Sequence, residues 1–383
     1  MRRSGSLAAV ALGLACLFLV SAPALSQPRA AATESVNFAG ETVHISRFAG
    51  GLENPWSIAF LPDGRLLVTE RPGRLRVVGR DGRLSPPVTG LPQVFARGQG
   101  GLLDVALAPD FATSRMVYFS YAEPRTDGAG TAVARGRLTG NLARLDGVEV
   151  IFRQQPSGSG SNHFGSRLAF ARDGTLFITL GDRYTMRDSA QDLSTTIGKV
   201  VRINPDGTIP EDNPFRATAG ARPEIWSYGH RNVQSAAISP VDGRLWTVEH
   251  GARGGDEVNI PQAGRNYGWP VITYGRDYSG ARIGEGTSKS GMEQPVFYWD
   301  PSIAPSGAAF YSGPLSRWRN DLFVGALAGM ALVRLHVEDG KVTGEDRLAL
   351  NKRIRDVRMG PDGALWLAVD DNEGEILRIV PGR

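Results

Sequence analysis

One pattern of hydrophobic and polar residues recurs along the chain. An apolar stretch is followed by a turn rich in Pro, Asp and Gly, and then by a strand-like alternating run. Asp-Gly between two such runs favours a tight hairpin, because glycine readily takes the positive φ that the turn requires. Each copy therefore predicts two antiparallel strands. Six copies are present, beginning at Ile58, Val105, Leu168, Ala236, Ala308 and Val357.

The spacing of the copies predicts how they assemble. Successive copies start roughly 50 to 70 residues apart, which is typical of a β-propeller with inserted loops. We predict an all-β fold, a six-bladed β-propeller of four-stranded antiparallel blades. Pairing of residues 42–47 with residues 375–380 would close the ring and remove exposed sheet edges. The alternative is a sandwich of unrelated hairpins.

The first residues follow a different pattern. Arg2 and Arg3 precede an apolar run from Leu7 to Val20, and the small residues of SAPALSQ follow. This order is typical of a secretory signal peptide, and the run is too short for a transmembrane helix. A soluble protein exported to a bacterial periplasm, with no membrane span, is expected. The predicted parts are a signal peptide over 1–26, an N-terminal linker over 27–40 and the propeller domain over 41–383.

Composition narrows the classes of function. An apolar content of 41% excludes a disordered chain. The single cysteine, Cys16, lies in the predicted signal peptide, so the mature chain has neither a disulfide framework nor a thiolate zinc site. The 43 basic residues nearly balance the 39 acidic ones, and no basic cluster is interleaved with aromatic residues. Nucleic-acid binding is therefore not expected.

Polar residues follow the second strand of several copies. Because they occupy the same place in the repeat, we expect them to gather at one end of the propeller, where binding sites commonly form. Signatures of zinc proteases, serine hydrolases and P-loop enzymes are absent from the sequence. The stretch 254–259 offers oxygen ligands suited to calcium, although an ordinary acidic turn explains it equally well. The strand-end pairs are Glu70-Arg71, Gly181-Asp182, Glu249-His250 and Asp370-Asp371.

A set of short motifs runs in order from about residue 50 to the C-terminus. They include GQGGLLD at 98–104, HFGSRL at 163–168, GKVVRI at 198–203, YGHRN at 228–232, NYGWP at 266–270 and RIRD at 353–356. This ordered set resembles the soluble pyrroloquinoline quinone (PQQ)-dependent glucose/sorbosone dehydrogenases, and among them the bacterial aldose sugar dehydrogenases. The resemblance implies a six-bladed propeller, in agreement with the repeats. It also implies an enzyme that oxidises aldoses at the anomeric carbon to lactones.

The resemblance implies roles for particular residues. His163 is similar to the base that takes the proton of the anomeric hydroxyl while hydride passes to the quinone, and Asp182 matches the carboxylate that supports it. A neutral imidazole can accept a proton at neutral pH. Gln99 matches a side chain that contacts the quinone or a substrate oxygen. Arg231 and Asn232 match the pair that lies against the cofactor and polarises its reactive carbonyl, a catalytic role for Arg231. The other implied PQQ-binding residues are Ser302, Arg353 and Arg355.

Calcium is implied at two places. The backbone carbonyls of Gly251 and Ala252 match ligands of the ion that also binds PQQ, whereas Glu257 and Tyr267 match ligands of a structural calcium ion. One position departs from the glucose dehydrogenases of the family, because Ala328 stands where they place a lysine on the cofactor. Loss of that cation should weaken PQQ affinity by about 1.5–3 kcal/mol, the value typical of a hydrogen bond to a charged group.

Two other functions fit parts of the pattern. A calcium-dependent propeller hydrolase, such as a lactonase, shares the predicted fold, calcium and histidine base, but has no use for Arg231, Arg353 and Arg355 together. A propeller that binds sugar or protein without chemistry would tolerate His163→Gln. For the dehydrogenase, the expected partners are an aldose substrate and an external electron acceptor (a quinone or a redox protein). The chain is expected to be a monomer or a homodimer.

Overall fold

The computed structural model describes Met1 and residues 33–382. The predicted signal peptide, apart from Met1, and residues 27–32 of the predicted linker lie outside the described residues. None of the helices in the described part of the chain has the length and hydrophobicity of a membrane span.

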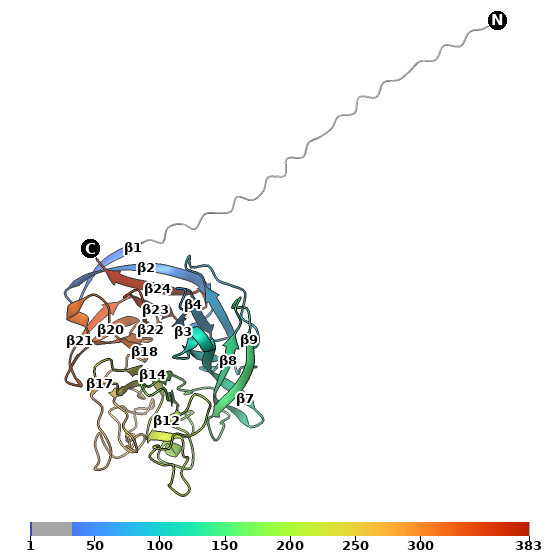
Figure 1. Ribbon diagram of the computed structural model, residues 1–383. Coiled ribbons are helices and arrows are strands. Elements are labelled where there is room, and N and C mark those ends of the chain that lie inside the picture. Colours follow the sequence, from blue (N-terminus) through green and yellow to red (C-terminus); the bar gives the residue numbers. More distant parts are fainter. Residues whose placement is uncertain (2–32, 383) are drawn as a thin grey trace. The chain divides into compact units, whose positions relative to one another are not determined.

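Six antiparallel sheets form the blades of a propeller (Figure 1). This confirms the predicted six-bladed all-β fold. The first blade contains β3 (Pro55–Phe60), β4 (Leu66–Glu70) and β5 (Arg74–Val78). The second contains β6 (Leu102–Leu107), β7 (Met116–Arg125), β8 (Gly128–Leu138) and β9 (Leu145–Arg153). The third contains β10 (Leu168–Phe170), β11 (Leu176–Thr179), β12 (Lys199–Ile203) and β13 (Ile225–Tyr228).

The remaining blades follow in chain order around the ring. The fourth contains β14 (Val233–Ile238), β15 (Leu245–Glu249), β16 (Asp256–Asn259) and β17 (Phe297–Trp299). The fifth contains β18 (Pro305–Phe310), β19 (Leu322–Ala326), β20 (Ala331–Glu338) and β21 (Lys341–Ala349). The sixth contains β22 (Ile354–Met359), β23 (Leu365–Val369), β24 (Gly374–Pro381), β2 (Glu41–Leu52) and β1 (Thr33–Phe38). The described helices are short: α1 (Phe111–Ser114), η1 (Arg187–Ala190) and η2 (Ser316–Trp318).

The six sequence repeats form the two inner strands of the six blades. Each innermost strand, β3, β6, β10, β14, β18 and β22, contacts its neighbours around the ring. The second strands, such as β4, β15, β19 and β23, are buried along their whole length. Outer strands such as β9 and β21 alternate between buried and exposed positions instead. Burial on both faces explains why the inner strands carry the clearest apolar runs.

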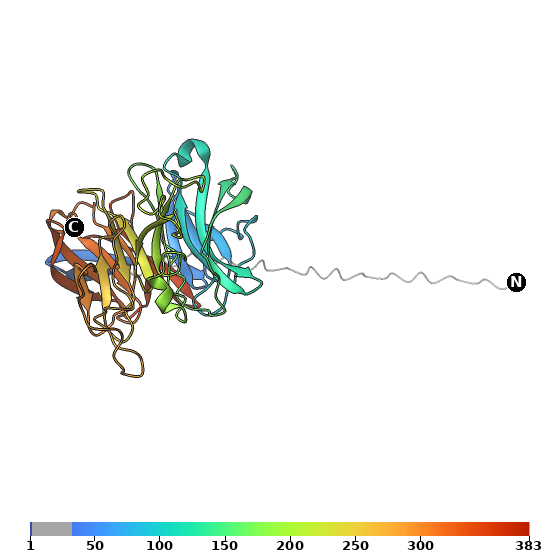
Figure 2. The same cartoon turned by 90° about the horizontal axis from the view of Figure 1, so that it is seen from below.

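The ring closes inside the sixth blade, as the sequence predicts. Strand β2 pairs with β24, with His44 opposite Val380 and Arg47 opposite Leu377. Figure 1 shows these two strands, blue and red, side by side, and Figure 2 shows the ring turned by 90°. The first and last strands of residues 33–382 therefore belong to one sheet.

Two blades depart from the predicted four strands. The first blade has three, followed by isolated bridges from Leu75 to Val88 and from Val78 to Leu84. Pro86 and Pro87 lie in this segment and cannot donate to a ladder. The sixth has five, because residues 33–38, which the sequence assigned to the linker, form β1.

A two-residue hairpin turn explains the extra strand β1. Phe38 lies opposite Glu41, and Ala39 and Gly40 between them have φ values of 51° and 78°. Positive φ at both central residues fits the turn type that matches the twist of antiparallel strands. Ala-Gly is not the usual sequence signal for this turn, so the strand could not be read from the sequence.

Buried charges link four blades at the centre of the ring. Arg167 lies 2.8 Å from Asp356 and 3.4 Å from Asp104, and Arg358 lies 2.6 Å from Asp104 and 2.8 Å from Asp356. Asp104 also accepts hydrogen bonds from the Ser57 hydroxyl at 2.5 Å and from the Leu168 amide at 2.8 Å. The two arginines and two aspartates balance in charge, so the cluster connects the inner strands without a net buried charge.

Replacement of Asp104 by alanine is expected to lower the free energy of unfolding by about 3–5 kcal/mol, because it leaves buried arginine charge uncompensated. Urea denaturation followed by tryptophan fluorescence would measure this loss. Asp81→Ala is the control, since Asp81 pairs only with exposed Arg83. Equal unfolding midpoints for the two variants would contradict a stabilising role for the central cluster.

Candidate active site

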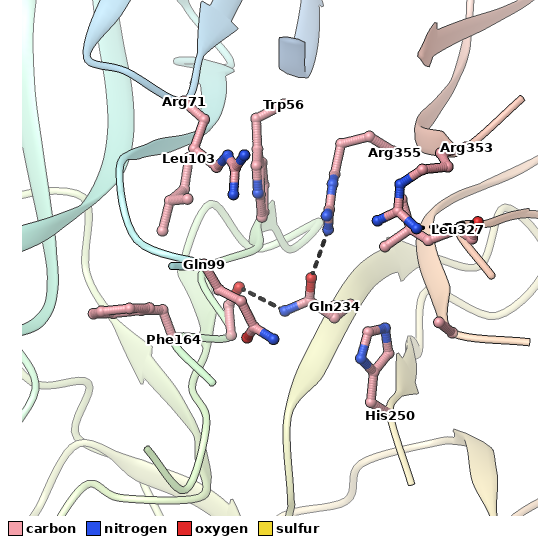
Figure 3. A pocket seen from close by; sticks show the side chains of 12 residues that line it. Trp56, Arg71, Gln99, Leu103, Phe164, Gln234, His250, Leu327, Arg353 and Arg355 are labelled. Atoms are coloured by element: carbon pink, nitrogen blue, oxygen red, sulfur yellow. Dashed lines mark hydrogen bonds between the residues drawn. The ribbon is translucent and has the colours of Figure 1, made fainter. Parts of the chain in front are cut away.

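Two neighbouring cavities lie where the second strands of the blades end. The first, of about 290 Å³, is lined by residues that include Arg71, Gln99, His250, Arg353 and Arg355 (Figure 3). The second, of about 230 Å³, is lined by residues that include His163, Asp182, Tyr184, Arg231 and Tyr278. Arg71, Asp182 and His250 all come from the predicted strand-end pairs. The expectation that these polar residues gather at one end of the propeller is confirmed.

Arginine side chains give the first cavity its charge. Arg353 and Arg355 share one carboxylate, that of Asp370, at 3.4 and 3.3 Å. Arg71 is a third cation, and its guanidinium makes one hydrogen bond within residues 33–382, to the Gly98 carbonyl, at 2.6 Å. The Arg355 side chain is 12% exposed, and its buried Nε has no hydrogen-bond partner in the described part of the chain. Three guanidinium groups near one carboxylate leave donors for an anionic ligand.

His163 and Asp182 form a buried pair in the second cavity. His163 Nδ1 lies 2.6 Å from Asp182 Oδ1, and Asp182 Oδ2 accepts a hydrogen bond from the Trp269 indole at 2.8 Å. The Tyr184 amide donates to Asp182 Oδ1 at 2.8 Å. The carboxylate therefore fixes the imidazole through Nδ1. Nε2 of His163 makes no hydrogen bond within residues 33–382, so it remains available to a ligand.

The surroundings keep His163 uncharged near neutral pH. Burial lowers its pKa, and the Arg231 and Arg183 cations act in the same direction, against the opposing hydrogen bond and charge of Asp182. A neutral imidazole held by a carboxylate can act as a general base.

Gln99 joins the two cavities. Its side chain lines the first cavity, while its Oε1 accepts the backbone N–H of His163 at 2.8 Å. His163 has a φ of 52°, in the left-handed region that side chains other than glycine rarely adopt. The bond to Gln99 helps to hold this conformation. Gln99 thus lies at the boundary where a molecule in the first cavity would approach the histidine.

Arg231 and Asn232 hold buried donors that have no partner among residues 33–382. The Arg231 guanidinium lies 5.2 Å from the ring centre of Trp269 and donates to the carbonyls of His250 and Gly251, yet its Nε is unpartnered. Asn232 Oδ1 accepts from the Gly165 amide at 3.2 Å, whereas its Nδ2 is unpartnered. Buried donors without partners are costly and favour a ligand that accepts from them. Asn232 lies outside the lining of both cavities.

Several of the predicted calcium ligands meet at a third, small cavity. It has a volume of about 10 Å³ and is lined by Gly251, Glu249, Glu257 and Tyr267, among others. Glu249 and Glu257 lie opposite each other on β15 and β16. Burial and then the nearby Glu249 carboxylate raise the pKa of Glu257. A pair of buried carboxylates that disfavour each other's charge suits a bound cation.

Of the other predicted metal and cofactor residues, some lie apart from this small cavity and some already have partners within the protein. Ala252 lines the second cavity instead. The Tyr267 hydroxyl already donates to the Ile260 carbonyl at 2.6 Å and accepts from the Gln262 amide at 3.0 Å. Ser302 donates to Asp256 at 2.5 Å and lines neither of the two larger cavities. Within residues 33–382, no group of three or more His, Cys, Asp and Glu side chains is arranged around a common metal position.

Comparisons with known proteins assign this chain to a family. The family profile described as "Glucose / Sorbosone dehydrogenase" matches residues 52–378. The chain belongs to the glucose/sorbosone dehydrogenase family. It is 50% identical over 347 residues to aldose sugar dehydrogenase YliI of Escherichia coli, covering 89% of this chain and 93% of the relative. It is 26% identical over 410 residues to quinoprotein glucose dehydrogenase B of Acinetobacter calcoaceticus, covering 85% and 84%.

Solved structures give the same assignment. The apo-form of the soluble aldose sugar dehydrogenase of E. coli aligns with a TM-score of 0.86 and 48% identity, covering 89% of this chain and 100% of that one. The PQQ-bound form of an aldose sugar dehydrogenase of Streptomyces coelicolor aligns with a TM-score of 0.73 and 28% identity, covering 92% and 99%. This member of the glucose/sorbosone dehydrogenase family is thus a homologue of quinoprotein sugar dehydrogenases.

Sequence reasoning missed some lining residues of this family member. Trp269 belongs to the NYGWP motif, but the motif does not predict that its indole donates a hydrogen bond to Asp182. Arg71 was visible only as a strand-end residue. Trp56 and Gln234 also line the first cavity and had no sequence signal. Ala328, at the position of the family lysine, is exposed, and its neighbour Leu327 lines the first cavity.

Proposed function

We propose that the protein is a PQQ-dependent oxidoreductase that oxidises aldoses at the anomeric carbon to lactones. The observation that carries the proposal is the adjacency of an arginine-lined cavity and a histidine–carboxylate pair. PQQ has three carboxylates, and three guanidinium groups near one protein carboxylate, with an unpartnered Nε on Arg355, fit such an anion. Family membership and the PQQ-bound relative from S. coelicolor support the same choice.

Particular residues would hold the cofactor and the metal. Arg71, Arg353 and Arg355 would bind the carboxylates of PQQ, while Gln99 and the unpartnered Nε of Arg231 would face its carbonyl oxygens. Asn232 offers a further unpartnered donor within residues 33–382. Ser302, which the resemblance aligns with a cofactor-contacting hydroxyl, would also contact PQQ, through the hydroxyl that here donates to Asp256. For calcium, we propose the carbonyls of Gly251 and Ala252 at the cofactor, and Glu257 with Tyr267 at a structural ion.

The chain's own residues would perform the proton chemistry. The aldose would occupy the second cavity, with its anomeric hydroxyl at Nε2 of His163. His163 takes the hydroxyl proton, and Asp182 stabilises the imidazolium that forms, through Nδ1. Bound PQQ would supply the acceptor for the hydride of the same carbon, which leaves the lactone as product. His163 then returns its proton to solvent.

Export and an external electron acceptor belong to the same proposal. The segment 1–26 has the pattern of a signal peptide, so we propose that the protein acts in the periplasm. There a quinone or a redox protein would reoxidise the cofactor. The size of any assembly, monomer or homodimer, stays a prediction.

The test is reconstitution of purified mature protein with PQQ and Ca²⁺, an artificial electron acceptor and a panel of aldoses. Reduction of the acceptor only when protein, PQQ, Ca²⁺ and sugar are all present is the expected result. A parallel assay offers aldonolactones without PQQ. Lactone hydrolysis there, with no acceptor reduction by any sugar, would replace the dehydrogenase by a lactonase.

Replacement of Asp182 by asparagine is expected to lower kcat by about 10²- to 10⁴-fold, because the imidazolium loses its carboxylate partner. The hydrogen bond and charge of Asp182 raise the pKa of His163 against the lowering effect of burial. Without them the pKa falls further, so the acidic limb of the kcat/KM profile should move to lower pH even as the rate drops. Steady-state kinetics between about pH 4.5 and 8 would measure both changes. An unmoved acidic limb would show that Asp182 does not act on His163.

A further inference from the structure

Arg183 is a buried cation that the proposed chemistry leaves without a role. It directly follows Asp182, its side chain is fully buried, and its guanidinium carbon lies 3.5 Å from the ring centre of Phe164. The guanidinium lies within 4 Å of no carboxylate in the described part of the chain, and Nε is unpartnered. Burial lowers the pKa of Arg183 to about 10, so it remains charged at neutral pH. A buried charge without an ion-pair partner costs stability, so a compensating benefit is expected.

The contacts of Arg183 converge on the segment that carries His163. Its two terminal nitrogens donate to the carbonyls of Gly160 and Asn162, and Phe164 packs against its face. These three residues lie on both sides of His163 in the chain. Arg183 therefore holds the backbone before the histidine and the side chain after it.

The segment needs such support, because its backbone is strained. His163 has a φ of 52° and Ser166 a φ of 93°, a backbone conformation that residues other than glycine adopt only at a cost in free energy. The Gln99 side chain supplies one bond to the His163 amide. Strain of this kind persists only where the surrounding structure over-determines it. Arg183 adds the bonds to the carbonyls of Gly160 and Asn162, just before the histidine.

Charged and titratable groups reach His163 from several elements. Asp182 bonds its ring, and the Tyr184 ring lies edge-on at 5.2 Å. Arg183 and Arg231 lower its pKa by their charge. His250 is also near, since the charge of His163 lowers the pKa of His250. Four further ionisable groups line the second cavity with His163: Arg187, Asp188, Asp277 and Tyr278.

We propose that Arg183 is a positioning residue for His163, which clamps residues 160–164 so that the base keeps its orientation toward the second cavity. The inference rests on the proposed function, in which His163 takes the proton of the sugar. Arg183 itself lines neither of the two larger cavities, so it acts through the histidine and not on the substrate.

The experiment compares Arg183→Met, Arg183→Lys and Arg202→Met in the full mature chain reconstituted with PQQ and Ca²⁺. Arg202 is the matched control: it is also buried and lies 5.1 Å from the ring centre of Trp226, but it bonds Asp173 and Asp212 away from the site. Arg183→Met is expected to lower kcat by about 10- to 100-fold, the scale of a small misplacement of a catalytic group. KM and PQQ affinity should stay within about threefold of the parent, by this same reasoning.

A second readout does not depend on turnover. NMR titration of the His163 ring, in protein with Ca²⁺ and without PQQ, follows its protonation directly, and the signal is assigned by its loss in His163→Gln. Removal of the Arg183 cation should move the titration to higher pH, and Arg183→Lys should return it toward the parent value. Arg202→Met should leave both kcat and the titration unchanged.

The outcomes separate the inference from the proposed function. If the parent oxidises no aldose but the titration shifts in Arg183→Met and recovers in Arg183→Lys, the proposed function fails and the coupling of Arg183 to His163 stands. If the parent is active and Arg183→Met keeps kcat within twofold and the titration unmoved, the clamp is wrong. Equal losses of kcat in Arg183→Met and Arg202→Met would also overturn it, since a general loss of stability would then explain both.

Discussion

Replacement of His163 by glutamine is expected to lower kcat by about 10²- to 10⁴-fold, the contribution typical of a positioned general base. Glutamine occupies a similar volume and can still bond Asp182, but it cannot accept a proton at neutral pH. His163 lines the second cavity, while the three arginines line the first. PQQ affinity should therefore stay close to that of the parent.

Two measurements test this result: steady-state oxidation of an aldose by the reconstituted enzyme, and titration of the protein with PQQ. His336→Gln is the control, because His336 is partly exposed and bonds Asp346 on the outer strands of the fifth blade. Retention of more than a tenth of the parental kcat in His163→Gln would remove His163 from the role of base. Absence of any turnover by the parent would instead favour a binding protein without chemistry.

The second large effect is expected on cofactor binding. Replacement of Arg355 by methionine should weaken PQQ affinity by about 10- to 150-fold, which corresponds to 1.5–3 kcal/mol for a hydrogen bond to a charged group. The Arg355 side chain is nearly buried, bonds the Gln234 side chain at 3.0 Å and has an unpartnered Nε. Its loss removes one cation from the first cavity and leaves Asp370 paired with Arg353 alone, so the carboxylate repels an anion more strongly.

Reconstitution of activity at increasing PQQ concentration would measure the affinity of the Arg355 variant. At saturating PQQ, kcat should recover to within about threefold, because a loss of uniform binding leaves the chemical step intact. Arg244→Met serves as the control, since Arg244 is an exposed arginine that pairs with Asp242 in the turn between β14 and β15. An unchanged PQQ affinity in Arg355→Met would show that the first cavity does not hold the cofactor carboxylates.

Much of the fold could be predicted because the inner strands repeat. Their burial on both faces leaves apolar runs that end in an Asp-Gly or related turn, and six such runs predict six blades. The outer strands are partly exposed and carry weaker signals. The exposed strand β1 is not predicted for this reason. The predicted fourth strand of the first blade does not form, because Pro86 and Pro87 lie in the segment that would pair with β5.

Some residues of the site could be predicted from the sequence, and others could not. Gln99, His163, Asp182, Arg353 and Arg355 lie within short ordered motifs, and the structure brings them to the two cavities. Arg71 and Trp56 belong to the first blade and Arg355 to the sixth. Only closure of the ring makes these blades neighbours and brings the three side chains to one cavity. Contacts between residues so far apart in the sequence leave no local pattern in it.

The pairing of β2 with β24 also has a consequence for the order in which the protein can fold. Strand β2 ends at Leu52 and its partner begins at Gly374, so nearly the whole chain must leave the ribosome before the sixth blade can form. Until then both edges of the open ring carry unpaired backbone groups that can pair with other chains. Because the chain is synthesised from its N-terminus, the propeller can close only after β24 has been made. A chain that stops before β24 cannot form this pairing and leaves the ring open.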